Sequence, residues 1–154
     1  MCLLLSGTAV LSGEKTSLRW KNFNDGIAEA KKTNKKILVD VYTDWCGWCK
    51  KMDEEVYANK DIATYLADRY LVVKLDAESD SKIDYNDMAM TEMDLARAFG
   101  IDGYPATIFM RPDGKAITLV PGYIRAETFL KVIKYIGENH YEKMKWEEYV
   151  AKKR

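Results

Sequence analysis

The chain has 154 residues, of which 47% are hydrophobic and 31% charged, a composition typical of one soluble domain with a buried core. Lysine plus arginine and aspartate plus glutamate both number 24, so no basic surplus points to a nucleic-acid partner. With three cysteines and one histidine, we expect neither a structural zinc site within one chain nor a disulfide-stapled scaffold.

The first segment in chain order is an apolar stretch from Cys2 to Leu11, followed by Ser-Gly. It is too short to span a bilayer and resembles the end of the hydrophobic region of a secretory signal. We interpret residues 1–14 as the remnant of such an export signal or as a disordered N-terminus, in which Cys2 has no role. An apolar segment docked on the domain is the alternative. Residues 15–154 then form a single domain.

Helical and strand patterns alternate through the rest of the chain. We expect helices over residues 25–32, 46–58, 62–69, 92–99, 127–136 and 141–153, and strands over 17–20, 36–43, 70–76, 106–110 and 115–120. The two central apolar strands, 36–43 and 70–76, are each followed by a helix and should run parallel. The last two strands should form an antiparallel hairpin. The prediction is an α/β fold: a mixed sheet covered by helices on both faces, with an extra C-terminal helix.

Trp45-Cys46-Gly47-Trp48-Cys49-Lys50 is the pattern that says most about function. It follows a buried strand, so its cysteines lie in the first helical turn, where unpaired backbone N–H groups and the helix dipole favour a thiolate. The second thiol, one turn on, is close enough to close a disulfide. The motif predicts a two-electron redox switch in which Cys46 is the accessible, ionised nucleophile and Cys49 the resolving thiol.

Two charged residues stand alone in the central apolar strands, Asp40 in the first and Lys74 in the second. A bare carboxylate is costly there, so the pKa of Asp40 should rise, and Asp40 is the candidate acceptor for the proton that Cys49 must lose. Opposite charges on adjacent buried strands predict a direct or water-bridged pair. The alternatives are an outward-facing Asp40 and a Lys74 whose ammonium reaches solvent.

Five ordered motifs make residues 20–136 resemble the thioredoxin-like family. They are the Trp-Cys-x-x-Cys-Lys motif, Val39-Asp40, Val73-Lys74-Leu75, Gly103-Tyr104-Pro105-Ala106-Thr107, and Asp113-Gly114-Lys115 with Gly122. Within the family the chain is most similar to exported bacterial thiol–disulfide oxidoreductases, such as the C-terminal domain of DsbD and related periplasmic proteins. It departs from thioredoxin at Gly47-Trp48, where thioredoxin has Gly-Pro, in a longer 77–93 segment and in its C-terminal extension.

The resemblance implies which residues contact a substrate. It implies a cis peptide bond before Pro105, which leaves the backbone of Tyr104 free to pair with an extended substrate beside Cys46. Trp45 and Trp48 would form an apolar docking surface. Packing in the core is the alternative, and it is favoured more for Trp45 than for Trp48.

The function implied is that of a thiol–disulfide oxidoreductase that reduces or exchanges protein disulfides through a mixed disulfide. We expect a monomer without cofactor, metal, nucleic-acid partner or stable membrane insertion, supplied with electrons by an upstream redox partner protein. The expected location is periplasmic or otherwise extracytoplasmic, with the cytoplasm as the alternative. Other open functions are a disulfide isomerase or oxidant of the cell envelope, a Cu(I)- or zinc-binding module, and a docking module with a vestigial motif.

The remaining segments carry weaker predictions. Residues 77–93 are polar and acidic and are interpreted as a long loop at the same sheet edge as the cysteines. Three methionines in and beside it are more typical of packing than of Cu(I) binding: Met88, Met90 and Met93. We expect His140 to be solvated and residues 142–154 to form an exposed charged helix.

Overall fold

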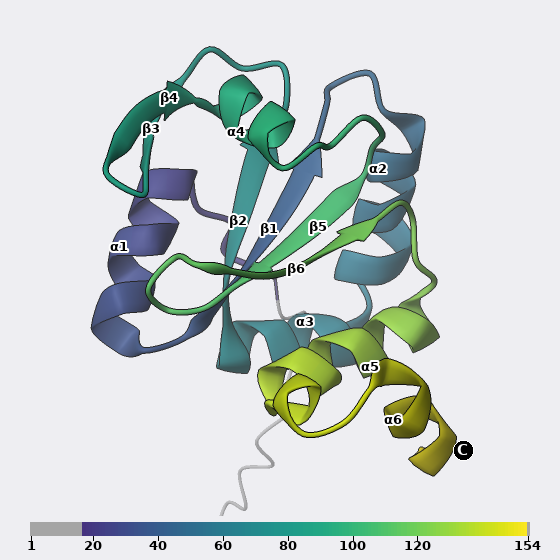
Figure 1. The fold of residues 1–154 in the computed structure, drawn as a ribbon. Coiled ribbons are helices and arrows are strands. Elements are labelled where there is room, and N and C mark those ends of the chain that lie inside the picture. Colours follow the sequence, from purple (N-terminus) through teal and green to yellow (C-terminus); the bar gives the residue numbers. More distant parts are fainter. Residues whose placement is uncertain (1–16, 154) are drawn as a thin grey trace, which may run out of the picture.

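The structure, a computed structural model, describes residues 17–153, so the predicted signal remnant at 1–14 and Cys2 lie outside the described residues. Its centre is a four-stranded sheet in the order β2-β1-β5-β6 (Figure 1). The strands are β1 (Lys36–Tyr42), β2 (Tyr70–Asp76), β5 (Ala106–Met110) and β6 (Ala116–Pro121). β1 and β2 run parallel, while β5 is antiparallel to β1 and β6 to β5. The predicted mixed sheet, with parallel strands first and a hairpin last, is confirmed.

Helices cover both faces of the sheet, as predicted (Figure 1). One face packs against α1 (Phe23–Thr33) and α4 (Glu92–Ala98). The opposite face packs against α2 (Gly47–Met52), α3 (Lys60–Arg69) and α5 (Ala126–Gly137). The protein therefore has two hydrophobic cores, one on each face of the sheet.

The alternation of side chains along β1 decides which core receives Asp40. Val39 and Val41 face the core under α1 and α4, and Leu38 faces the core under α3 and α5. Because successive side chains of a strand point to opposite faces, Asp40 lies on the same face as Leu38. It is 1% exposed, so the outward-facing alternative is wrong.

The helices α1 and α3 begin at asparagine side-chain caps, and this moves their predicted boundaries. Asn22, rather than Asn24 or Asp25, caps α1 by accepting a hydrogen bond from the backbone N–H of Asp25. Asn59 caps α3 in the same way. The helix predicted over 46–58 is α2 as far as Met52 and then continues as a π-helical turn, η1 (Asp53–Tyr57).

Residues 77–93 are not a long loop, and that prediction is wrong. They contain a two-stranded hairpin, β3 (Lys82–Tyr85) and β4 (Met88–Thr91), in which Ile83 is buried against the α1 core. The connecting residues Asn86 and Asp87 both have positive φ, the conformation of a tight hairpin turn. The edge strand predicted over 17–20 is also absent from the described structure, where only Lys21 bridges to β2, at Val73.

The predicted C-terminal helix is confirmed, but one side of the C-terminal extension is packed on the domain, so the expectation of full exposure is wrong. The extension ends in α6 (Trp146–Lys152), whose Tyr149 is 3% exposed. The rings of Trp146 and Tyr149 lie 5.4 and 5.1 Å from the ring of Tyr135 on α5. His140 is half-buried, with its ring 4.9 Å from that of Tyr149, so the prediction that it is solvated is also wrong.

Replacing Tyr149 by Ala tests whether this packing holds the extension in place. A seven-residue helix has little stability of its own, so α6 depends on the buried ring. We expect Tyr149→Ala to lower the free energy of unfolding in urea by about 3 kcal/mol, as for other buried aromatic truncations. Glu148→Ala, on the exposed face of the same helix, is the control and should change it by less than about 0.5 kcal/mol. Equal effects of the two variants would contradict the packed role of α6.

Candidate active site

The two cysteines lie at the junction between the end of β1 and the first turn of α2. Cys46 is the N-cap residue of α2, and its sulfur accepts a hydrogen bond from the backbone N–H of Cys49 at 3.1 Å. The N–H of Cys46 donates in turn to the carbonyl of Thr43, which follows the last residue of β1. Cys46 and Cys49 are joined in a disulfide, with their Cα atoms 5.3 Å apart. The structure therefore represents the oxidised form of the predicted switch.

Both cysteines are buried in this form, each with an exposed fraction of 4%. The expectation that Cys46 is freely accessible is therefore wrong for the disulfide state. The tryptophans beside them are exposed instead: the exposed fraction is 67% for Trp45 and 56% for Trp48. The exposed surface next to the disulfide in sequence is therefore that of these two indoles.

Trp45 joins the cysteine turn to two other segments of the chain. Its indole N–H donates to a carboxylate oxygen of Glu78, just after β2, at 3.0 Å. Its ring lies edge-on to that of Tyr104 at 6.0 Å. Core packing, which the sequence favoured for Trp45 over Trp48, is wrong for both residues. Trp45 is the more exposed of the two, because its ring covers Tyr104 instead of entering a core.

The Tyr104–Pro105 peptide bond is cis, as the family resemblance implied. Pro105 is buried, and its carbonyl accepts a hydrogen bond from the N–H of Gly122 at 2.8 Å. Through the contact of Tyr104 with Trp45, this segment lies beside the cysteine turn. Trp48 stands against a different neighbour, the ring of Tyr123, at 5.3 Å.

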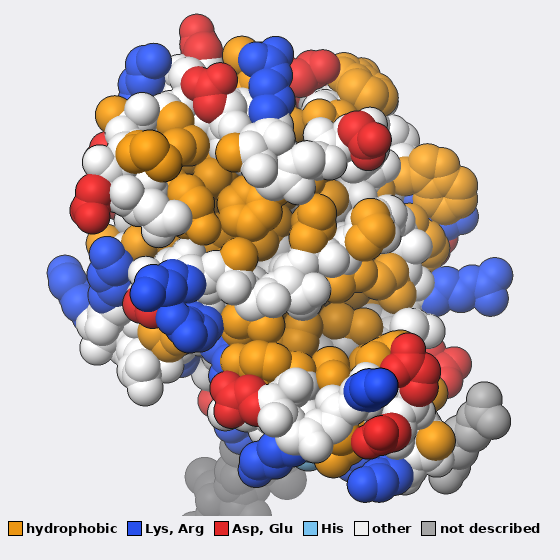
Figure 2. Space-filling view, in the orientation of Figure 1, with side chains coloured by type: hydrophobic (Ala, Val, Ile, Leu, Met, Phe, Trp, Pro, Cys, Tyr) orange, Lys and Arg blue, Asp and Glu red, His pale blue; other side chains and the backbone are white. Residues whose placement is uncertain are grey.

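Apolar side chains continue from this segment across the neighbouring surface. Figure 2 shows them gathered in the middle of the face that lies between α4 and α5. A shallow cavity of about 340 Å³ runs along part of it, and its lining includes Ile101, Tyr104, Leu119 and Pro121.

Asp40 and Lys74 are opposite each other in the register of β1 and β2, and they form the predicted pair directly. The Lys74 ammonium lies 2.5 Å from Oδ2 of Asp40. Burial raises the pKa of Asp40, and although the charge of Lys74 acts in the opposite direction, the pKa stays above its ordinary value. Partial burial lowers the pKa of Lys74, but its bonds to the carboxylates outweigh this effect and the pKa is raised overall.

The turn η1 supplies two further polar groups that the sequence analysis missed. Asp53 accepts a second hydrogen bond from the Lys74 ammonium at 2.6 Å, and the Tyr57 hydroxyl donates to Oδ1 of Asp40 at 3.2 Å. Both residues could have been found, because Cys49, Asp53 and Tyr57 recur every four residues and so share one helical face.

Aromatic rings complete the surroundings of the Lys74 ammonium. It lies 4.7 Å from the ring centre of Trp20, 5.3 Å from that of Tyr42 and 5.5 Å from that of Tyr57. Ring faces attract a cation, so they offset part of the free energy that the ammonium loses when it leaves water. No pattern in the sequence indicated this group of three rings around the ammonium, since the rings come from three separate segments of the chain.

Comparison with known proteins agrees with this geometry. Residues 23–137 match the family model described as a thioredoxin-like domain. The chain belongs to the thioredoxin-like family. It is 32% identical over 108 residues to the thiol:disulfide interchange protein DsbD of Ralstonia nicotianae, a match that covers 70% of this chain and 16% of that protein. It is 29% identical over 109 residues to the protein disulfide-isomerase of Hordeum vulgare, with coverages of 70% and 18%.

The solved structures agree with the fold of this thioredoxin-like chain. A thioredoxin-fold protein from Helicobacter pylori superposes with a TM-score of 0.64 at 20% identity, covering 92% of this chain and 85% of that one. The curated relatives are much longer than the matched region: the chain spans less than a fifth of the length of DsbD or of the isomerase.

Two features are absent from the described part of the chain. Residues 17–153 contain no cluster of three or more His, Cys, Asp or Glu side chains arranged to hold a metal ion. Within the same range, no helix has the length and apolar character needed to cross a bilayer.

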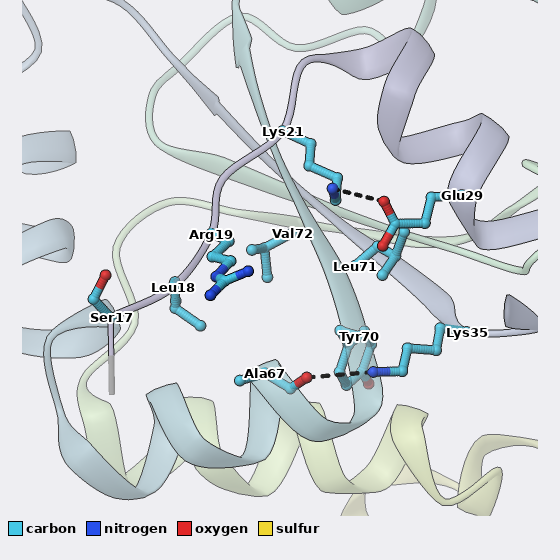
Figure 3. A pocket seen from close by; sticks show the side chains of 10 residues that line it. All are labelled: Ser17, Leu18, Arg19, Lys21, Glu29, Lys35, Ala67, Tyr70, Leu71 and Val72. Atoms are coloured by element: carbon cyan, nitrogen blue, oxygen red, sulfur yellow. Dashed lines mark hydrogen bonds and ion pairs between the residues drawn. The ribbon is translucent and has the colours of Figure 1, made fainter. Parts of the chain in front are cut away.

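A separate cavity of about 530 Å³ lies far from the cysteines (Figure 3). It is lined by the first residues of β2, including Tyr70 and Val72, whereas the cysteines follow the last residue of the parallel strand β1. Two of its lysines are engaged already: Lys21 pairs with Glu29 at 2.6 Å, and Lys35 donates to the carbonyl of Ala67. The cavity is therefore not part of the thiol site.

Replacing Asp40 by Asn tests the balance between burial and pairing. Because the pKa of Asp40 is raised on folding, the protein loses stability as the pH rises from the ordinary range of an aspartate through the folded-state pKa. Lys74 keeps Asp53 as a partner, so the variant leaves no uncompensated ammonium. We expect Asp40→Asn to be more stable than the parent protein at pH 8 by about 1–2 kcal/mol, with a smaller difference at pH 4.

Urea unfolding of the oxidised protein at both pH values measures this difference. Asp68→Asn, which alters an exposed carboxylate on α3, is the control and should show no comparable dependence on pH. An Asp40→Asn protein that is less stable than the parent at pH 8 would show that the pairing outweighs the burial.

Proposed function

We propose that this thioredoxin-like domain is a thiol–disulfide oxidoreductase that reduces or exchanges the disulfides of partner proteins. The observation that carries the proposal is the Cys46–Cys49 disulfide at the start of α2 in a chain that also buries a paired carboxyl, Asp40. A closed ring of this size constrains the unfolded chain by only about 2 kcal/mol, which favours a reactive role over a structural one. The DsbD and disulfide-isomerase relatives support the same chemistry.

In the proposed reaction the reduced Cys46 thiolate attacks one sulfur of a partner disulfide. A mixed disulfide forms, and the other partner sulfur leaves as a thiolate. The backbone N–H of Cys49, which bonds to the Cys46 sulfur in the oxidised form, would stabilise the attacking thiolate. Cys49 then attacks the Cys46 sulfur, which releases the second partner thiolate and restores the Cys46–Cys49 disulfide. Two electrons pass from the domain to the partner.

Asp40 is the proposed acceptor of the proton that Cys49 gives up. Its raised pKa makes Asp40 a stronger base than an exposed aspartate, and therefore a better acceptor for the proton of a thiol. Among residues 17–153, no hydrogen bond links Asp40 to either cysteine in the oxidised form. The proton would therefore pass from Cys49 to Asp40 through an intervening water. Lys74 balances the charge of Asp40 before the transfer.

We assign partner contact to Trp45, Trp48, Tyr104 and Pro105. The exposed indoles flank the buried disulfide, and Tyr104 lies against Trp45. Aromatic side chains of this kind are enriched at the centres of protein interfaces. The apolar surface beside Tyr104 would extend the contact along the partner chain.

Electrons for repeated turnover would come from an upstream redox partner protein, and the domain would act as a monomer outside the cytoplasm. Resemblance to the exported branch of the family, which includes DsbD, supports this location and favours a reductase. Similarity to a disulfide isomerase favours a second candidate, an isomerase or oxidant of the cell envelope. The two candidates differ in the direction of electron flow, so the reduction potential separates them.

Serine substitutions of the cysteines test the assignment of roles. We expect Cys46→Ser to abolish reduction of insulin disulfides, because no nucleophile remains, and Cys49→Ser to accumulate mixed disulfides that non-reducing electrophoresis detects. Cys2→Ser is the matched control and should retain full activity. Normal insulin reduction by Cys46→Ser would refute the proposed function.

The reduction potential of the Cys46–Cys49 pair tests the direction of electron flow. For a reductase we expect a value nearer to the roughly −270 mV of thioredoxin than to the roughly −120 mV of DsbA. The measurement is the fraction of disulfide at equilibrium in dithiothreitol and glutathione buffers, read by alkylation and mass. A value near that of DsbA would instead support the oxidant or isomerase.

A further inference from the structure

The Tyr57 hydroxyl is a buried polar group that takes no direct part in the steps of the proposed thiol exchange. Tyr57 is 4% exposed, and its ring is held edge-on between Trp20 at 4.9 Å and Phe129 at 5.6 Å. Its hydroxyl donates to Oδ1 of Asp40 and also takes part in a hydrogen bond with the side chain of Thr107, the residue opposite Asp40 on β5. A hydroxyl has one proton to donate, so Thr107 is the donor in that second bond.

The two oxygens of the Asp40 carboxylate are therefore held by different kinds of group. Oδ2 faces the ammonium of Lys74, which is shared with the half-exposed Asp53 and lies partly in solvent. Oδ1 faces a phenol that is enclosed on both sides by aromatic rings. Lys74 can move towards Asp53 without losing its only partner, whereas the ring of Tyr57 is fixed between two aromatic rings. Tyr57 therefore offers Oδ1 of the carboxylate a fixed donor.

We propose that Tyr57 is a positioning residue for the thiol exchange: its hydroxyl holds the buried Asp40 carboxylate in one orientation and keeps it ionised until Cys49 gives up its proton. The inference rests on the proposed function, because it concerns the same proton transfer. Tyr57 itself does not contact the partner and exchanges no electrons.

The step in which Tyr57 takes part moves one proton. The S–H bond of Cys49 breaks and an O–H bond forms on Asp40, so a thiol and a carboxylate become a thiolate and a carboxylic acid. Because Tyr57 continues to donate to Oδ1, the incoming proton goes to Oδ2, and the ammonium of Lys74 stays bound to Asp53. The thiolate then attacks the mixed disulfide, and the departing partner sulfur carries the negative charge away.

The charged neighbours of Asp40 do not change when Tyr57 loses its hydroxyl. Lys74 comes from β2 and Asp53 from η1, while the β5 neighbour, Thr107, is neutral. Cys46 caps α2 and Cys49 lies within it. The substitution Tyr57→Phe keeps the ring and its packing while removing one donor from the carboxylate. A hydrogen bond to an ionised group is stronger than a neutral one, so the pKa of Asp40 should rise in this variant by about one unit.

Carboxyl-carbon NMR of the reduced protein measures the titration of Asp40 directly. We expect the midpoint for Tyr57→Phe to lie about one pH unit above that of the parent protein. The acid limb of the pH profile for insulin reduction should move by the same amount, so that activity below the limb falls about tenfold while the plateau is kept. Identical titrations of the two proteins would overturn the inference. A shifted titration with superimposable pH profiles would overturn it too.

Tyr70→Phe is the matched control. Tyr70 is equally buried and its hydroxyl also donates one hydrogen bond, to the carbonyl of Ile133 at 2.7 Å, but it lies at the start of β2. Both variants should lose similar stability in urea, whereas only Tyr57→Phe should move the titration of Asp40. An equal shift in Tyr70→Phe would mean that the effect is general loosening of the core and would overturn the positioning role.

A measurement on the unaltered protein covers the case in which Tyr57→Phe does not fold. The buried Tyr57 hydroxyl proton should exchange slowly with water, and its NMR resonance should move with the titration of Asp40. A hydroxyl proton that exchanges as rapidly as that of an exposed tyrosine would overturn the inference. Failure of the proposed function is a different result: insulin would then not be reduced by the parent protein at any pH, whatever the titration of Asp40.

Discussion

The pair of Asp40 and Lys74 is the interaction on which the rest of this site depends. The two residues are opposite each other because β1 and β2 run parallel in one register. A shift of either strand by one residue would turn its charge into the opposite core, where it would meet only apolar side chains. The pair therefore depends on the register of the two central strands.

Such a pair does not stabilise a fold at low cost, since desolvation of two charges competes with their attraction. Here the surrounding groups offset part of that penalty. Asp53 accepts a second hydrogen bond from the ammonium, Tyr57 donates one to Asp40, and three rings face the ammonium. The balance still leaves the pKa of Asp40 raised, which is the condition that a carboxyl needs to take a proton from a thiol.

The sequence was informative wherever a residue type stood out from its neighbours. Charged residues inside apolar strands predicted the pair, and two cysteines after a strand predicted the disulfide. The β3–β4 hairpin was missed because its strands have four residues each and its turn is Asn86-Asp87 rather than a glycine turn. The exposure of Trp45 was missed because it depends on Tyr104 and Glu78, which are distant in sequence.

The sheet separates two tyrosines of the candidate site, Tyr104 and Tyr57. Tyr104 packs with the α1 and α4 core, together with residues of the β3–β4 hairpin such as Met90. Tyr57 packs with the α3 and α5 core, on the face that receives Asp40. Tyr104, whose ring lies against Trp45, and Tyr57, which bonds to Asp40, are therefore parts of two different cores. The sheet therefore separates the β3–β4 hairpin, which packs on the α1 face, from the groups that bond to Asp40 on the other face.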